Sequence, residues 1–218
     1  MNLTIIPVVF QPAAQPVDLD FEGPFWRGAN VLELARDWQD NAAPESLRTT
    51  AHAVRTRDHL CFGFTCHFTE LDMDDPAAPG FDPARERHAL WERDVCEAFV
   101  RSPLEPDPRV YKEFEIAPNG QFCDLLVDRR TMFKDWEWQS GMQVLHAIDD
   151  AARVYRVAMA IPFRVFDLTP QPGDCWHANL FRIARLDGRR QYLAFSPTLT
   201  PQPNFHIAER FARLEFID

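Results

Sequence analysis

The chain has 218 residues and a formal net charge of −10. This acidic balance argues against nucleic acid or an anionic membrane surface as a partner, because either needs a concentrated basic patch. No apolar run approaches the roughly 18 residues of a membrane helix. The opening sequence MNLTIIPVVF lacks the charged segment and cleavage site of a signal peptide, which favours the cytoplasm and leaves secretion open.

The composition favours strands joined by loops. The chain contains 18 prolines, 8 glycines and 18 phenylalanines. Prolines between short apolar runs disfavour long helices, and aromatic side chains suit a half-buried sheet. No repeat or low-complexity linker divides the sequence, so residues 1–218 are predicted to form a single domain.

The predicted elements begin with an extended, proline-dotted segment that runs through FEGPFW. The segments SLRTTAHAVRT and LCFGFTCHF then alternate as strands do. Residues 69–89 turn acidic and proline-rich, which predicts a long loop of the kind that is often functional.

The second half of the chain reads as a series of strands and hairpins. VYKEFEI and QFCDLLV flank Asn119-Gly120, a strong hairpin signal, and a second hairpin is predicted around Asp149-Asp150. FRVFDL after Pro162 suggests one helical turn. Roughly ten to twelve strands follow from this count. The predicted fold is an all-β, antiparallel β-sandwich of jelly-roll or immunoglobulin-like type, with little helix.

Two predicted strands carry glutamates on the same face as apolar or aromatic residues. In LWERDVCEAFV, period-2 alternation places Glu97 on one face with Val95 and Phe99. In VYKEFEI, Phe114 and Ile116 belong to the core, and Tyr111, Glu113 and Glu115 are predicted to face outward. An aromatic residue among polar ones is typical of a solvated strand. It also suits sugars, whose C–H faces stack on rings and whose hydroxyls need planar polar partners.

Metal and thiol sites have weak support. The five cysteines include no C-x-x-C, so buried free thiols are expected rather than a disulfide framework or a zinc site. The seven histidines are scattered without a metal-binding spacing. ELDMDD, residues 70–75, has carboxylates at alternate positions, as calcium loops do, but a solvated acidic loop is favoured.

Six motifs in chain order resemble the family 9 carbohydrate-binding modules, in particular the stand-alone family 9-like bacterial proteins. They are LWERDVCEAFV, YKEFEIAPNGQFCDL, RVAMAIPF, PGDCWHANLFRIAR, YLAFSPT and FHIAERFARLEF. The resemblance runs from about Trp26 to Phe216. It implies a β-sandwich that binds mono- or oligosaccharides between two tryptophans without catalysis, and it makes calcium a possible cofactor.

The resemblance also implies roles for single residues. Trp91 corresponds to one wall of the aromatic clamp, and Glu97 to an acceptor of sugar hydroxyls. Asn179 corresponds to a further polar ligand, and Glu113 stays a candidate from its place on the polar face. Arg182 stands near the position of the second tryptophan, where a guanidinium could stack on a ring.

Several alternatives remain open from the sequence. Glu97 could be a buried acid paired with Arg93 or Arg182. Glu97 with Glu113 or Glu115 could form the carboxylate pair of a glycoside-active enzyme. Met142 and Met159 with a histidine could hold haem, and the sandwich could be a structural or interaction module. Among the other tryptophans, residues 26, 38 and 176 are expected to pack, whereas Trp136 and Trp138 could form a loop platform.

Overall fold

The computed structural model describes residues 4–12 and 16–218. In these residues regular structure is β-strand with short 3-10 turns and no α-helix, which confirms the all-β prediction. No helix there has the length and hydropathy needed to cross a membrane. The strands are β1 (Ile5–Phe10), β2 (Leu32–Glu33), β3 (Arg36–Asp37), β4 (Thr49–Arg55), β5 (His59–His67), β6 (Val95–Arg101), β7 (Val110–Ile116), β8 (Phe122–Asp128), β9 (Phe133–Asp135), β10 (Gln143–Asp149), β11 (Val154–Pro162), β12 (Cys175–Leu186), β13 (Arg189–Ala194) and β14 (Ala212–Ile217).

The strands form one continuous mixed sheet. Its main path runs β10-β11-β5-β4-β1-β14-β12-β6-β7-β8-β9, and β13, β2 and β3 pair beside it. β1 is parallel to both β14 and β4, whereas the other pairs are antiparallel. The prediction of a purely antiparallel sandwich was therefore wrong, because alternation within a strand does not reveal the direction of its partner.

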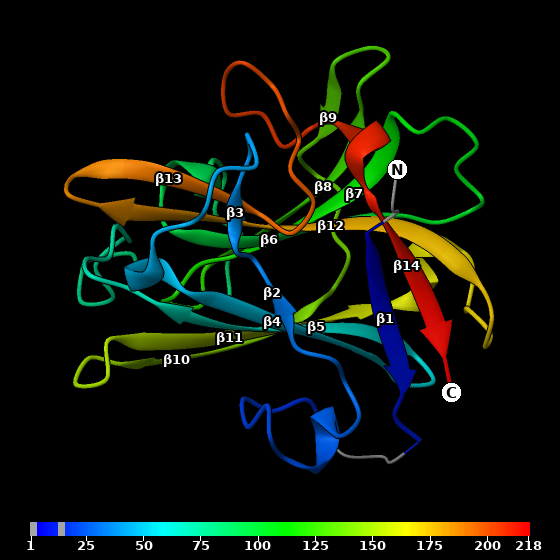
Figure 1. The fold of residues 1–218 in the computed structure, drawn as a ribbon, viewed down its shortest axis with the longest axis horizontal. Coiled ribbons are helices and arrows are strands. Elements are labelled where there is room, and N and C mark those ends of the chain that lie inside the picture. The colour runs from blue at the N-terminus through cyan, green and yellow to red at the C-terminus, as the bar shows by residue number, and fades with distance from the viewer. Residues whose placement is uncertain (1–3, 13–15) are drawn as a thin grey trace.

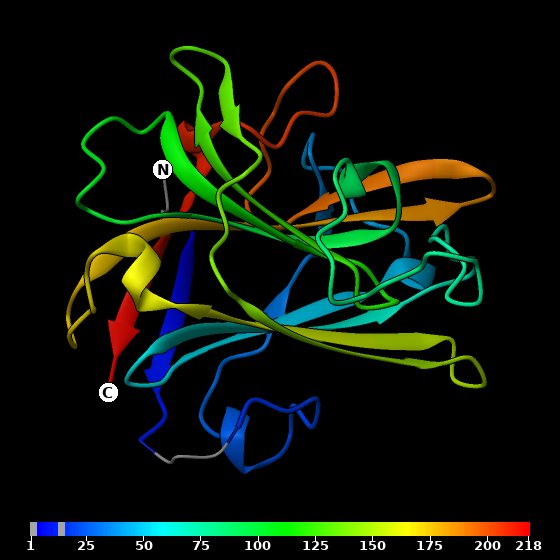
Figure 2. The ribbon, with the colours of Figure 1, turned by 180° about the vertical axis from the view of Figure 1, so that it is seen from behind.

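The sheet folds over so that its two halves face each other. Figure 1 shows β12, β6, β7 and β8 above β4, β5, β11 and β10, with β1 and β14 at one side, and Figure 2 shows the same two layers from behind. The main core lies between them and includes Phe62, Phe64, Phe114 and Trp176, all fully buried. Alternate residues of each strand supply this core.

Local signals in the sequence were reliable. β7 and β8 form the predicted hairpin, where Gly120 has a φ of +86°, a conformation that glycine adopts easily. β10 and β11 form the second hairpin around Asp149-Asp150, and Phe163–Phe166 is a 3-10 turn. Residues 69–89 contain no strand. Of the extended N-terminal segment, residues 1–3 and 13–15 lie outside the described part.

A second apolar cluster lies on the other face of the upper layer. It includes Phe99 of β6, Tyr111 of β7 and Phe181 of β12. Phe205 and Phe211 also belong to it and come from the segment between β13 and β14, and the ring of Phe205 stacks on Phe181 at 4.0 Å. That segment thus covers a sheet face which the sequence predicted to meet solvent.

Candidate functional site

Two tryptophans meet at the edge of the second cluster. Trp91 lies in the 3-10 turn Leu90–Glu92 after the long loop, and Trp136 directly follows β9. Their ring centroids are 5.6 Å apart with planes at 38°, and His88 stacks on Trp136 at 5.3 Å. Both indoles are partly exposed. Trp136, which the sequence left between platform and packing, is therefore the aromatic neighbour of Trp91.

Three glutamates on β6 and β7 lie near the two tryptophans. Glu97 shares its face with Val95 and Phe99, as alternation predicted. Glu97 of β6 pairs in register with Glu115 of β7, and Glu113 pairs with Phe99. Glu97 and Glu113 are 2% exposed and Glu115 is 0% exposed. The prediction that Glu113, Glu115 and Tyr111 face outward into solvent was wrong, because all three side chains are buried. His206 and Phe211, from the segment before β14, pack against Tyr111, and His206 also lies beside Glu113.

Burial dominates the protonation of these glutamates. It raises the pKa of Glu97 well above its usual range, with the charge of Glu113 adding to the effect. Burial also raises the pKa of Glu115, followed by the charges of Glu97 and Glu113. The nearby Lys134 acts in the opposite direction on both. Two of the three carboxyls therefore hold protons far above the pH at which an exposed glutamate loses its own.

Lys134 of β9 joins the tryptophans to the glutamates. Its Nζ lies 4.7 Å from the ring centroid of Trp91 and 5.6 Å from that of Trp136. The same Nζ is 3.9 Å from Oε2 of Glu113. The ammonium thus occupies the ring face of Trp91 on which another group could stack. Neither alternation nor resemblance pointed to this lysine.

His206 and Tyr111 close the other side of the glutamates. The hydroxyl of Tyr111 and Nδ1 of His206 share a hydrogen bond of 2.6 Å, and the imidazole stacks on Phe99. Burial lowers the pKa of His206 to about 4, so the ring is neutral at physiological pH. Nδ1 lies 3.9 Å from Oε2 of Glu113, and the neutral ring supplies no counter-charge there.

Asn179 lies on the same face of the sheet but has a structural role. It pairs in register with Phe99 across β12 and β6 and is fully buried. Its Nδ2 donates to the carbonyl of Ser196 at 2.8 Å, and its Oδ1 accepts from the Ser196 amide at 3.0 Å. The side chain thereby fixes the chain just after β13, and its proposed contact with a ligand stays a prediction.

Arg182 lies apart from the candidate site, on the opposite face of β12. Its guanidinium donates to the carbonyls of Leu47 and His67 and to Oγ1 of Thr49, at 3.1, 2.8 and 2.7 Å. It also lies over the ring of Tyr155, at 5.1 Å. Arg182 is fully buried in the main core, so it provides no second wall beside Trp91 and no partner for Glu97.

The alternative partner Arg93 is also engaged elsewhere. It bonds to Asp72 and Asp74 of the acidic loop, at 3.0 and 3.2 Å. Arg87 and Arg185 bond to the same two carboxylates. Two of the four carboxylates in the loop considered for calcium, Asp72 and Asp74, are thus occupied by arginines, and calcium binding stays a prediction. No group of three metal-binding side chains occurs in residues 4–12 and 16–218.

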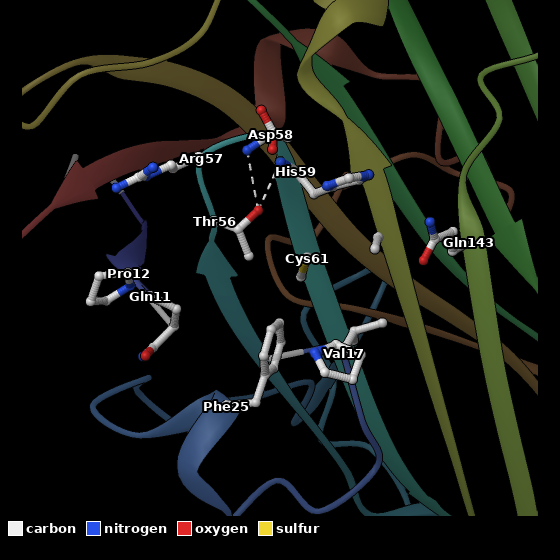
Figure 3. A pocket seen from close by; sticks show the side chains of 12 residues that line it. Gln11, Pro12, Val17, Phe25, Thr56, Arg57, Asp58, His59, Cys61 and Gln143 are labelled. Atoms are coloured by element: carbon white, nitrogen blue, oxygen red, sulfur yellow. Dashed lines mark hydrogen bonds between the residues drawn. The ribbon is translucent and has the colours of Figure 1, made fainter. Parts of the chain in front are cut away.

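Two of the surface hollows bear on the site. One of about 870 Å³ is lined by residues that include His88, Trp136, Glu86 and Asp124, and it adjoins the tryptophan pair. The other, of about 670 Å³, is shown in Figure 3, where Thr56, His59, Cys61 and Phe25 line it. None of the five predicted ligand-binding residues lines either hollow.

The sequence identified part of this site. Trp91, Glu97 and Glu113 all lie near Lys134, whereas Arg182 lies on the opposite face of β12, and their role as ligand contacts stays a prediction. Lys134 and His206 were missed because each reaches the site from a segment distant in sequence. The sequence offered Trp136 and Trp138 together as a loop platform, whereas the structure packs them against different apolar clusters.

Comparison with known sequences gives distant relatives of undefined activity. No model of a known protein family matches the chain. The UPF0462 protein C4orf33 homolog of Rattus norvegicus is 26% identical over 179 residues, which cover 79% of this chain and 84% of that protein. A protein of the fungus Arthroderma benhamiae, named "Extracellular protein", is 22% identical over 176 residues, 75% of this chain and 79% of its own.

Solved structures with the same fold share few residues with this chain. A candidate carbohydrate-binding protein from Bacteroides uniformis has a TM-score of 0.76 at 16% identity and covers 99% of this chain and 100% of its own. A family 9 carbohydrate-binding module from Caldicellulosiruptor kristjanssonii, in complex with cellotriose, has a TM-score of 0.66 at 11% identity and covers 98% and 93%. The chain therefore has the fold of the family 9 carbohydrate-binding modules, as its ordered motifs predicted.

Proposed function

We propose that the protein is a non-catalytic carbohydrate-binding protein whose sugar site is formed by Trp91 and Trp136. The observation that carries this proposal is the placement of two partly exposed indoles beside three carboxyl groups, on the fold of a module that holds cellotriose. Stacked rings and carboxyl acceptors are the two elements that a pyranose requires.

Each residue would have a defined role. A sugar ring would stack on Trp91 where the Lys134 ammonium now lies, and Glu97 and Glu113 would accept its hydroxyls. The hollow of about 870 Å³ beside Trp136 would hold further sugar units. Burial keeps both Glu97 and Glu115 protonated, so this pair lacks the ionised carboxylate that glycoside hydrolysis needs, which favours binding over hydrolysis.

Titration calorimetry with glucose, cellobiose and cellotriose tests the proposal. We expect measurable binding by the native protein, and we expect Trp91→Ala to remove it, because loss of a stacked ring costs about 1–3 kcal/mol in weak complexes of this kind. Trp91 is partly exposed, so the variant should fold. Absence of binding to these sugars and to amino sugars at millimolar concentration would refute the proposal.

Trp138→Phe is the matched control. Trp138 lies two residues from Trp136 but packs against the main core beside Phe114. This variant should bind as the native protein does. Circular dichroism of both variants would show whether any loss of binding at Trp91 comes from the ring itself or from unfolding.

A further inference from the structure

The three glutamates lack the partners that buried carboxylates need. Four of their oxygens are buried and accept no hydrogen bond within the described part of the chain: Oε1 of Glu97, Oε2 of Glu113 and both oxygens of Glu115. An unpartnered carboxylate in a protein interior costs several kcal/mol. Such a cluster does not stabilise the fold, so its unpartnered carboxyl groups indicate a ligand-binding site.

The protein's own ammonium already shows which chemistry the site accommodates. Lys134 lies against both indoles and is the cation nearest to Glu113. Two aromatic faces with a carboxylate behind them form the usual recognition site of an organic ammonium. β9 is the terminal strand of the sheet path and pairs only with β8, so Lys134 is held on one side and can leave.

Lys134 carries the positive charge nearest to the glutamates. Tyr111 of β7, Cys123 of β8 and His206 face the glutamates and are neutral at physiological pH. Arg129, after β8, acts at longer range on Tyr111 and His206. A neutral sugar that displaced the Lys134 ammonium would leave the Glu113 carboxyl without a cation beside it, whereas a protonated amine in the same place would supply one.

On the basis of the proposed function, we infer that the sugar bound at Trp91 and Trp136 is an amino sugar with a free amine, such as glucosamine or its β-1,4-linked oligomers. Its ammonium would take the place of the Lys134 Nζ between the indoles and Glu113. Its ring would stack on Trp91, and its hydroxyls would donate to Glu97 and Glu115.

Parallel titrations of the native protein with four compounds test this inference. The compounds are glucosamine, glucose, N-acetylglucosamine and ethanolamine, at about pH 6, where such amines are protonated. We expect glucosamine to bind about tenfold tighter than glucose or N-acetylglucosamine, because hydrogen bonds between charged groups are roughly twice as strong as neutral ones. Ethanolamine should bind most weakly, since it has no ring to stack.

The outcomes separate this inference from the proposed function. Equal binding of glucose and glucosamine would overturn the amino-sugar inference and leave carbohydrate binding intact. Equal binding of ethanolamine and glucosamine would show that the site does not recognise the sugar ring, and would overturn the inference that the ligand is a sugar. Binding of none of the four compounds would overturn the amino-sugar inference, and it would overturn carbohydrate binding as well if cellobiose and cellotriose also fail to bind.

Lys134→Ala gives a second, positive test. Removal of the competing ammonium should tighten glucosamine binding about threefold or more, the size of a cation–π contact, with no gain for glucose. Loss of binding for both sugars would instead assign Lys134 as a hydroxyl donor and overturn the inference. Arg130→Ala is the matched control, because it removes one exposed positive charge that pairs with Asp128.

Discussion

Glu115 is the residue whose proposed role in ligand binding most clearly lowers the stability of the fold. It is fully buried, and neither of its oxygens accepts a hydrogen bond in the described residues. Glu115→Gln removes the ionisable group and keeps the shape, so we expect the free energy of unfolding at pH 7.5 to rise by about 1–2 kcal/mol. For a chain of this length that corresponds to a melting temperature about 2–8 °C higher.

Differential scanning calorimetry of this variant provides the measurement. Glu33→Gln in β2 is the control, because Glu33 is exposed and its change should leave the melting temperature unaltered. A lower melting temperature in Glu115→Gln would show that the carboxyl supports the fold and would remove one basis for assigning it to a ligand.

At the same scale, the sequence revealed which face each residue takes but not what covers that face. Alternation placed Glu97 correctly beside Val95 and Phe99, and Phe114 correctly in the core. It could not show that His206 stacks over Phe99, because that contact joins residues about a hundred positions apart. Side-chain period is a property of one strand, whereas burial depends on every segment that packs against it.

At the scale of elements, Arg182 connects the two layers of the sheet. It projects from β12 and donates hydrogen bonds to Leu47, which precedes β4, to Thr49 in β4 and to His67 in β5. We expect Arg182→Met to lower the free energy of unfolding by about 3–5 kcal/mol, because it leaves buried carbonyls without donors. Urea denaturation measures this loss.

The hydrogen bonds by which Arg182 joins β12 to β4 and β5 form a clamp between the two layers. Arg185→Met, three positions along the same strand, is the control for this clamp. Arg185 is partly exposed and pairs with Asp72, so its loss should cost about 1 kcal/mol or less. An Arg182→Met protein of native stability that no longer binds sugar would contradict the clamp and restore the wall that the resemblance implied.

Hairpins and turns followed from the sequence because their determinants are local. The Asn119-Gly120 turn and the Phe163–Phe166 turn needed only neighbouring residues. The parallel pairing of β1 with β14 and β4 joins the two ends of the chain, and no local pattern encodes it. The sequence offered Trp136 as part of a loop platform but could not pair it with Trp91, since the two rings come from segments distant in sequence.

At the scale of the whole molecule, burial of ionisable groups makes stability depend on pH in opposing ways. Burial raises the pKa of Asp94 from 3.8 to about 7. The folded state therefore binds this proton more tightly than the unfolded state does. The stability that Asp94 contributes is fully present below about pH 4 and is lost as the pH rises to about 7. His206, whose pKa is lowered to about 4, acts in the opposite direction between about pH 4 and 6.5.

The difference between native protein and Asp94→Asn isolates one of these groups. Relative to the native protein, we expect the variant to gain about 2–4 kcal/mol of stability between about pH 4 and pH 8, because each unit of pKa shift is worth about 1.4 kcal/mol. Urea midpoints at several pH values for both proteins measure the gain, and His206 cancels from the difference because both contain it. A difference that stays constant with pH would show that Asp94 is ionised in the fold, held so by the nearby charge of Arg182. The buried guanidinium would then have a carboxylate partner in the core, and the clamp between the layers would be an ion pair rather than a set of hydrogen bonds to neutral groups.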